Sequence, residues 1–109
     1  MESSNKTLPA SESRTYDVEL STRLGKRIGQ LLLQLSGEGI TGFFRIMKSD
    51  NPIQGQFLEN GLCTLKGSIR TLGGVHPFEG TGRILPESIE ARLNCMGDSL
   101  PLLGTRKPE

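Results

Sequence analysis

The chain has little of what catalytic and nucleic-acid-binding proteins commonly use. It has no tryptophan, a single histidine, two cysteines, and only one tyrosine and four phenylalanines. Thirteen basic residues nearly balance twelve acidic ones, whereas nucleic-acid-binding proteins usually carry a clustered basic excess. No apolar run approaches the length of a membrane-spanning helix, and the N-terminal residues contain no secretion signal. We therefore expect a soluble, cytoplasmic protein with neither a nucleic-acid nor a membrane partner.

Length and local composition predict one domain with a polar extension. A chain of 109 residues suits one core. Residues 1–14 are rich in Ser and Glu and bury too little apolar surface to order themselves, so we predict a mobile polar tail. Residues 15–106 form the predicted domain, and residues 107–109 are a short polar end.

Alternation of apolar and polar residues dominates the predicted domain. Tyr16, Val18 and Leu20 alternate with Asp17 and Glu19, which is typical of a strand with one wet face. The same period recurs in seven further segments, whose inward positions we place at 29–35, 40–46, 53–57, 63–71, 76–84, 89–95 and 100–104. The sequence therefore predicts eight strands and no long helix.

Residues typical of turns separate these segments. We predict turns at Leu24–Gly25, Gly37–Glu38, Ser49–Pro52, Gly73–Gly74, Pro86–Glu87 and Gly97–Asp98, and a three-residue loop around Asn60–Gly61. The predicted turns imply these neighbours across strands: Leu31 and Phe44, Gly42 and Phe57, Phe44 and Gly55, Leu65 and Gly82, Gly67 and Gly80, Ile69 and Phe78, Ile84 and Ile89, Leu93 and Leu102.

Glycines recur inside the strands, at 29, 42, 55, 67, 80 and 104, roughly once per strand-and-turn unit. Mid-strand glycines let a sheet bend, and eight antiparallel strands are enough to close a barrel. We therefore predict an all-β, eight-stranded antiparallel up-and-down meander that forms a small barrel. A flattened barrel or a two-sheet sandwich is the alternative.

A group of small inward residues allows two interpretations. Either the sheet bends sharply there and large side chains fill the space, or the small residues form the floor of an apolar pocket. The pocket hypothesis takes its ligand-binding residues from the inward faces: Tyr16, Phe44, Phe57, Leu65, Gly67, Ile69, Phe78, Gly80, Gly82, Ala91 and Leu93. It requires no cofactor.

On the outer face, Leu32 and Phe43 are predicted neighbours among uncharged glutamines. Adjacent exposed apolar residues are typical of a surface that meets another protein. We expect some self-association or a partner protein at this surface.

His76 and Cys95 are the only pair that suggests chemistry. A thiol and an imidazole can form a nucleophile pair or ligate a metal, but either role needs further groups, and the sequence supplies none nearby. We predict no catalytic residue and no metal site. Cys63 and Cys95 fall two strands apart, so we predict free thiols.

The meander, its glycine repeat and the closing segment Leu100-Pro101-Leu102-Leu103-Gly104-Thr105-Arg106 resemble small lipocalin-like, or calycin, barrels. The resemblance covers Tyr16 to Arg106 and lacks the Gly-x-Trp element. It implies binding of a small apolar ligand inside the barrel. That function ranks first here, a structural or accessory subunit acting through its outer face second, and an enzyme with a site around His76 and Cys95 last.

Overall fold

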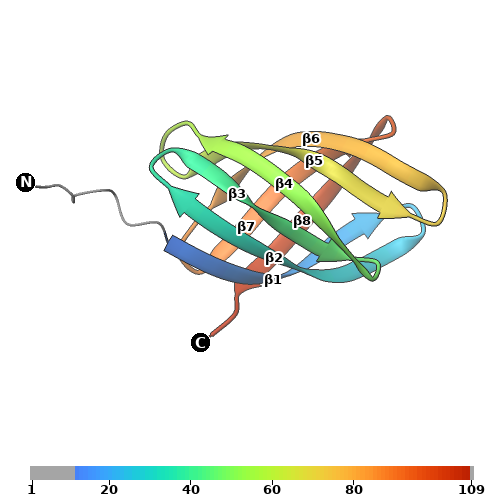
Figure 1. Ribbon diagram of the computed structural model, residues 1–109, viewed down its shortest axis with the longest axis horizontal. Helices are drawn as coiled ribbons and strands as arrows, with labels where there is room; N and C mark the ends of the chain where they lie inside the picture. Colours follow the sequence, from blue (N-terminus) through green and yellow to red (C-terminus); the bar gives the residue numbers. More distant parts are fainter. Residues whose placement is uncertain (1–11, 109) are drawn as a thin grey trace, which may run out of the picture.

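The computed structural model describes residues 12–108 and shows eight antiparallel strands with no helix (Figure 1). Each strand pairs with the next, and β8 returns to pair with β1, which closes the sheet into a barrel. Figure 1 shows β1, in blue, passing close to β8, in red. The strands are β1 (Glu12–Thr22), β2 (Gly25–Ser36), β3 (Gly39–Ile46), β4 (Ser49–Phe57), β5 (Leu62–Thr71), β6 (Gly74–Ile84), β7 (Ser88–Cys95) and β8 (Asp98–Arg106). The predicted all-β meander barrel is confirmed.

The period of two separates an apolar interior from a polar exterior. Tyr16, Phe44 and Leu93 are fully buried inside the barrel, while the residues between inward positions face solvent. Each buried side chain of this kind contributes about 1.5–3 kcal/mol relative to an exposed one. The core therefore runs along the barrel axis.

Strand faces follow the prediction, but several registers do not. Leu31 pairs with Phe44 and Ile84 with Ile89, as predicted. Between β5 and β6 the turn lies at Leu72–Gly73, one residue earlier than predicted, so each partner moves by two positions. The observed pairs are Leu65 with Gly80, Gly67 with Phe78 and Ile69 with His76. A two-residue shift leaves every side chain on its original face.

The β3–β4 connection differs most from the prediction. Met47 and Lys48 form the turn with φ of 55° and 64°, while Ser49–Pro52, predicted as a turn, belong to β4. Gly42 and Phe44 therefore pair with Ile53 and Asn51, not with Phe57 and Gly55. Positive φ at both central residues is the type I′ geometry that fits the twist of a hairpin.

The remaining turns lie at or beside their predicted positions. Gly37–Glu38 and Pro86–Glu87 are confirmed. The loop at Asn60 has three residues between Leu58 and Leu62, whose backbones are hydrogen-bonded. Arg23–Leu24 and Met96–Gly97 turn one residue earlier than predicted, so Leu93 pairs with Leu100 instead of Leu102.

β1 begins at Glu12, so residues 12–14, assigned to the tail from the sequence, are part of the barrel. The rest of that predicted tail lies outside the described residues. Among residues 12–108 no helix is long and apolar enough to cross a membrane.

Candidate functional site

The barrel interior holds all the residues predicted to line an apolar pocket. Tyr16, Phe44, Phe57, Leu65, Ile69, Phe78, Ala91 and Leu93 belong to or pack against one apolar cluster, and the glycines at 67, 80 and 82 lie on the same inward faces. Most of these large side chains are at most 4% exposed, although Phe57 is half-buried. These inward side chains are therefore largely shielded from solvent.

The inward glycines mark close approaches between neighbouring strands. A methyl group added at Gly80 would overlap the carbonyl oxygen of Arg92, and one at Gly82 would lie 2.5 Å from the Cβ of Ala91. At Gly67 it would meet the backbone of Pro52 at 2.5 Å and the ring of Phe78 at 3.0 Å. An added methyl group would meet the neighbouring strand at each of these positions, which favours the interpretation of a sharply bent sheet.

Polar groups close the end of the barrel where β1 begins. The Tyr16 hydroxyl donates to the carbonyl oxygen of Leu85 at 2.6 Å, and Arg14 donates to the Tyr16 hydroxyl at 3.1 Å. Two Arg14 nitrogens also pair with the Glu12 carboxylate, at 2.7 and 3.2 Å. The hydrogen bond to Glu12 raises the pKa of Arg14, and the same bond lowers the pKa of Glu12. The cluster ties β1 to the β6–β7 turn across the barrel mouth.

Asn51 closes the barrel near the opposite end. It is 3% exposed, and its amide donates to the carbonyl oxygen of Phe44 at 2.9 Å. Its side-chain oxygen accepts the backbone N–H of Arg70 at 2.8 Å. The β4–β5 ladder extends only to Ile53, next to Pro52, which lacks an N–H, and the Asn51 side chain continues the link to β5 beyond that point. Asn51 is predicted from the sequence to lie in a turn, so its link to β5 is not visible there.

His76 and Cys95 lie on the neighbouring strands β6 and β7. His76 pairs with Ile69 and Cys95 with Phe78, which leaves the two side chains diagonal to each other. Burial raises the pKa of Cys95, with Asp98 adding to the shift, and burial raises the pKa of Cys63 to about 11. Reactive thiols show the opposite shift. Both cysteines are free, as predicted, and no group of metal-ligating side chains occurs within residues 12–108.

On the outer face, an apolar row crosses three strands. Leu32 pairs with Phe43, as predicted, and Phe43 pairs with Pro52. Phe43 is 49% exposed, and the row lines a surface hollow of about 800 Å³ over β1–β5. Pro52 was not predicted as a surface residue of this row, because Ser49–Pro52 were expected to form a turn and not the start of β4. We call Leu32, Phe43 and Pro52 the apolar row.

Charged side chains border the apolar row on one side. Gln30 donates to Asp17 at 3.0 Å, and Arg45 pairs with Asp50 at 2.8 Å. The hydrogen bond to Arg45 lowers the pKa of Asp50. Uncharged Gln34, Thr41 and Gln54 border the other side and line the same hollow. An apolar centre with a polar rim is the usual anatomy of a protein interface.

No family model matches the chain, and no curated protein or solved structure matches it significantly.

Proposed function

We propose that this protein is a non-enzymatic barrel subunit that works by associating through the apolar row. The observation that carries the proposal is the half-exposed ring of Phe43, held between Leu32 and Pro52 inside a hollow. Apolar side chains grouped on an otherwise polar face gain free energy when a partner removes them from water.

The partner that fits this surface is a second copy of the chain. A closed barrel offers no unpaired strand edge, so a partner must be held by side chains on the outer face. A two-fold axis parallel to the strands, between β3 and β4, would set Phe43 against Pro52 of the second copy and Arg45 against its Asp50. Apolar contacts and opposite charges would then match in both directions, as a two-fold interface requires.

Ligand binding inside the barrel, the function implied by the lipocalin-like resemblance, stays a prediction and ranks second. The interior is apolar, which suits an apolar ligand. The close approaches at Gly67, Gly80 and Gly82 leave little space beside them.

The proposal places the protein in the cytoplasm, where its free cysteines would remain reduced.

Sedimentation equilibrium of the wild type and two variants tests the association. We expect a wild-type dimer, and at least tenfold weaker association for Phe43→Asp, because a carboxylate replaces the ring at the centre of the contact. Leu103→Asp is the matched control: Leu103 is also an outward residue, 56% exposed, but it lies on β8. Circular dichroism checks that both variants fold.

A wild type that stays monomeric at high concentration contradicts the proposal. Equal dissociation by the Leu103 variant contradicts it as well, because the effect would then not belong to the apolar row.

A further inference from the structure

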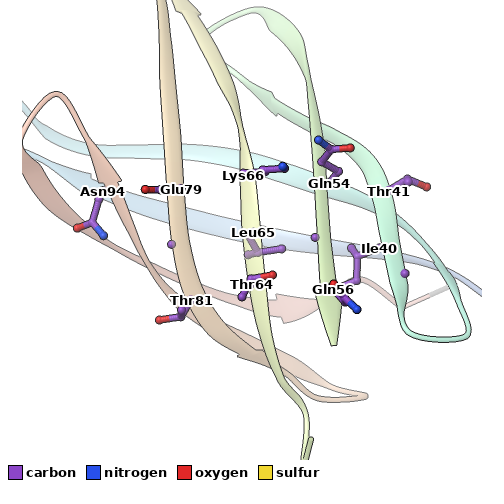
Figure 2. A pocket seen from close by; sticks show the side chains of 13 residues that line it. Ile40, Thr41, Gln54, Gln56, Thr64, Leu65, Lys66, Glu79, Thr81 and Asn94 are labelled. Atoms are coloured by element: carbon purple, nitrogen blue, oxygen red, sulfur yellow. The ribbon is translucent and has the colours of Figure 1, made fainter. Parts of the chain in front are cut away.

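A second hollow, of about 630 Å³, lies on the outer face across β3–β7. Its volume falls within the roughly 300–1,000 Å³ typical of small-molecule sites. Figure 2 shows the strands side by side with polar side chains projecting from them. Eight polar side chains line it: Thr41, Gln54, Gln56, Thr64, Lys66, Glu79, Thr81 and Asn94. We call this hollow the polar groove.

The polar side chains of the groove are not engaged with one another. Within residues 12–108, none of the eight forms a hydrogen bond or ion pair with another protein group. Neighbouring outer residues do pair: Gln30 with Asp17 at 3.0 Å, and Arg92 with Ser99 at 3.2 Å. The groove therefore presents donors and acceptors that a ligand can use without breaking bonds inside the protein.

The two charges in the groove are of opposite sign and do not point at each other. Lys66 and Glu79 are partners across β5 and β6, and Figure 2 shows Lys66 extending toward Gln54 while Glu79 points toward Asn94. The lining is neutral in sum, so it does not favour a polyanion. Its only large apolar residues, Ile40 and Leu65, are buried in the core, which leaves no apolar anchor for a protein or lipid.

We propose that the polar groove binds a neutral saccharide. Hydroxyl and amide side chains both donate and accept hydrogen bonds, as do the adjacent hydroxyls of a sugar. Six of the eight side chains are hydroxyls or amides, drawn from five neighbouring strands, so they can follow a chain of several sugar units across the sheet. The groove adjoins the hollow of the apolar row, with which it shares Thr41, Gln54 and Lys66 on β3–β5, and it continues beyond that hollow over β6 and β7.

The test is an NMR titration of the full ¹⁵N-labelled chain with three neutral oligosaccharides, maltohexaose, cellohexaose and hexa-N-acetylchitohexaose, each to about 10 mM. We expect at least one of them to give saturable shifts at the amides of Thr64, Thr81 and their neighbours on β4–β6. Gln56→Leu combined with Thr81→Val removes two hydrogen-bonding groups and should weaken binding about tenfold. Thr105→Val, an outward substitution on β8, should leave it unchanged.

Absence of saturable shifts in the groove with all three oligosaccharides overturns the proposal. So does binding that the Gln56 and Thr81 substitutions leave intact, or shifts confined to the interior residues. Gln56 and Thr81 lie outside the hollow of the apolar row, but Thr41, Gln54 and Lys66 line both hollows. The titration is therefore also run on Phe43→Asp, so that binding in the groove is measured without association.

Discussion

Single residues decide how the two ends of the barrel close. Tyr16 and Arg14 join β1 to the β6–β7 turn at one end, and Asn51 joins three strands near the other. Each binds backbone groups of a neighbouring strand or turn, and an unsatisfied buried polar group costs about 1–3 kcal/mol. Their substitution should therefore cost more stability than that of polar residues on the outer face.

Asn51→Ala should lower the free energy of unfolding by about 2–4 kcal/mol, because it removes the hydrogen bonds of a buried side chain to the Phe44 carbonyl and to the Arg70 N–H. Urea denaturation measures the loss. Gln56→Ala, an exposed change on the same strand, should stay within about 0.5 kcal/mol of the wild type. Similar values for the two variants would show that Asn51 does not link the strands.

Gly80→Ala should destabilise the barrel by about 2–3 kcal/mol, since the added methyl group meets the backbone of β7. Thermal unfolding measures the effect. At Gly39 an added methyl group lies 3.4 Å from its nearest neighbour, so Gly39→Ala should change stability little. Unchanged stability of Gly80→Ala would show that there is free space at this position, and it would support the hypothesis of a pocket inside the barrel.

Cys63 should make stability fall at high pH. Its folded pKa of about 11 lies above the usual value of 9.0, so its contribution is complete below pH 9 and disappears as the pH rises through 11. The loss should reach about 2 kcal/mol. Urea denaturation at intervals from pH 8 to 11 measures it against Cys63→Ala, which retains every other titrating group. Parallel pH profiles for the two proteins would contradict the assignment.

At the scale of elements, the sequence predicts strands and their faces better than registers. Alternation identifies the inward side of each strand regardless of its partner, because that side depends only on local residue order. Register depends on which two residues occupy each turn. Met47 and Lys48 carry no turn signal, whereas Ser49–Pro52 carry a strong one and nevertheless extend β4. The free-energy cost of positive φ at Met47 and Lys48 is offset by the hydrogen bonds that Asn51 makes inside the barrel.

That cost predicts a stabilising double substitution. Met47→Asn with Lys48→Gly puts residues that tolerate positive φ at both positions and should raise the free energy of unfolding by about 1–2 kcal/mol. Chemical denaturation measures the gain. The same pair introduced at Arg23 and Leu24, neither of which has positive φ, should give no gain. Equal stabilisation at both turns would contradict the role of backbone strain.

At the scale of the whole molecule, the number of strands and their short turns predicted a meander able to close, and the pairing of β1 with β8 is what closes it. The functional surfaces could be predicted only in part. Leu32 and Phe43 were recognisable as outward neighbours, but the third member of their row, Pro52, depends on the true β3–β4 register. The hollows on the outer face depend on how neighbouring strands bend, and no pattern along a single strand contains that information.

Native mass spectrometry of the gently purified protein tests most directly whether it works through its outer face. The account predicts a dimer whose mass is twice that of the chain, with no small molecule released on denaturation, and a monomer for Phe43→Asp. A monomer that carries extra mass and loses it on denaturation would contradict the account. That result would favour binding of a small ligand inside the barrel.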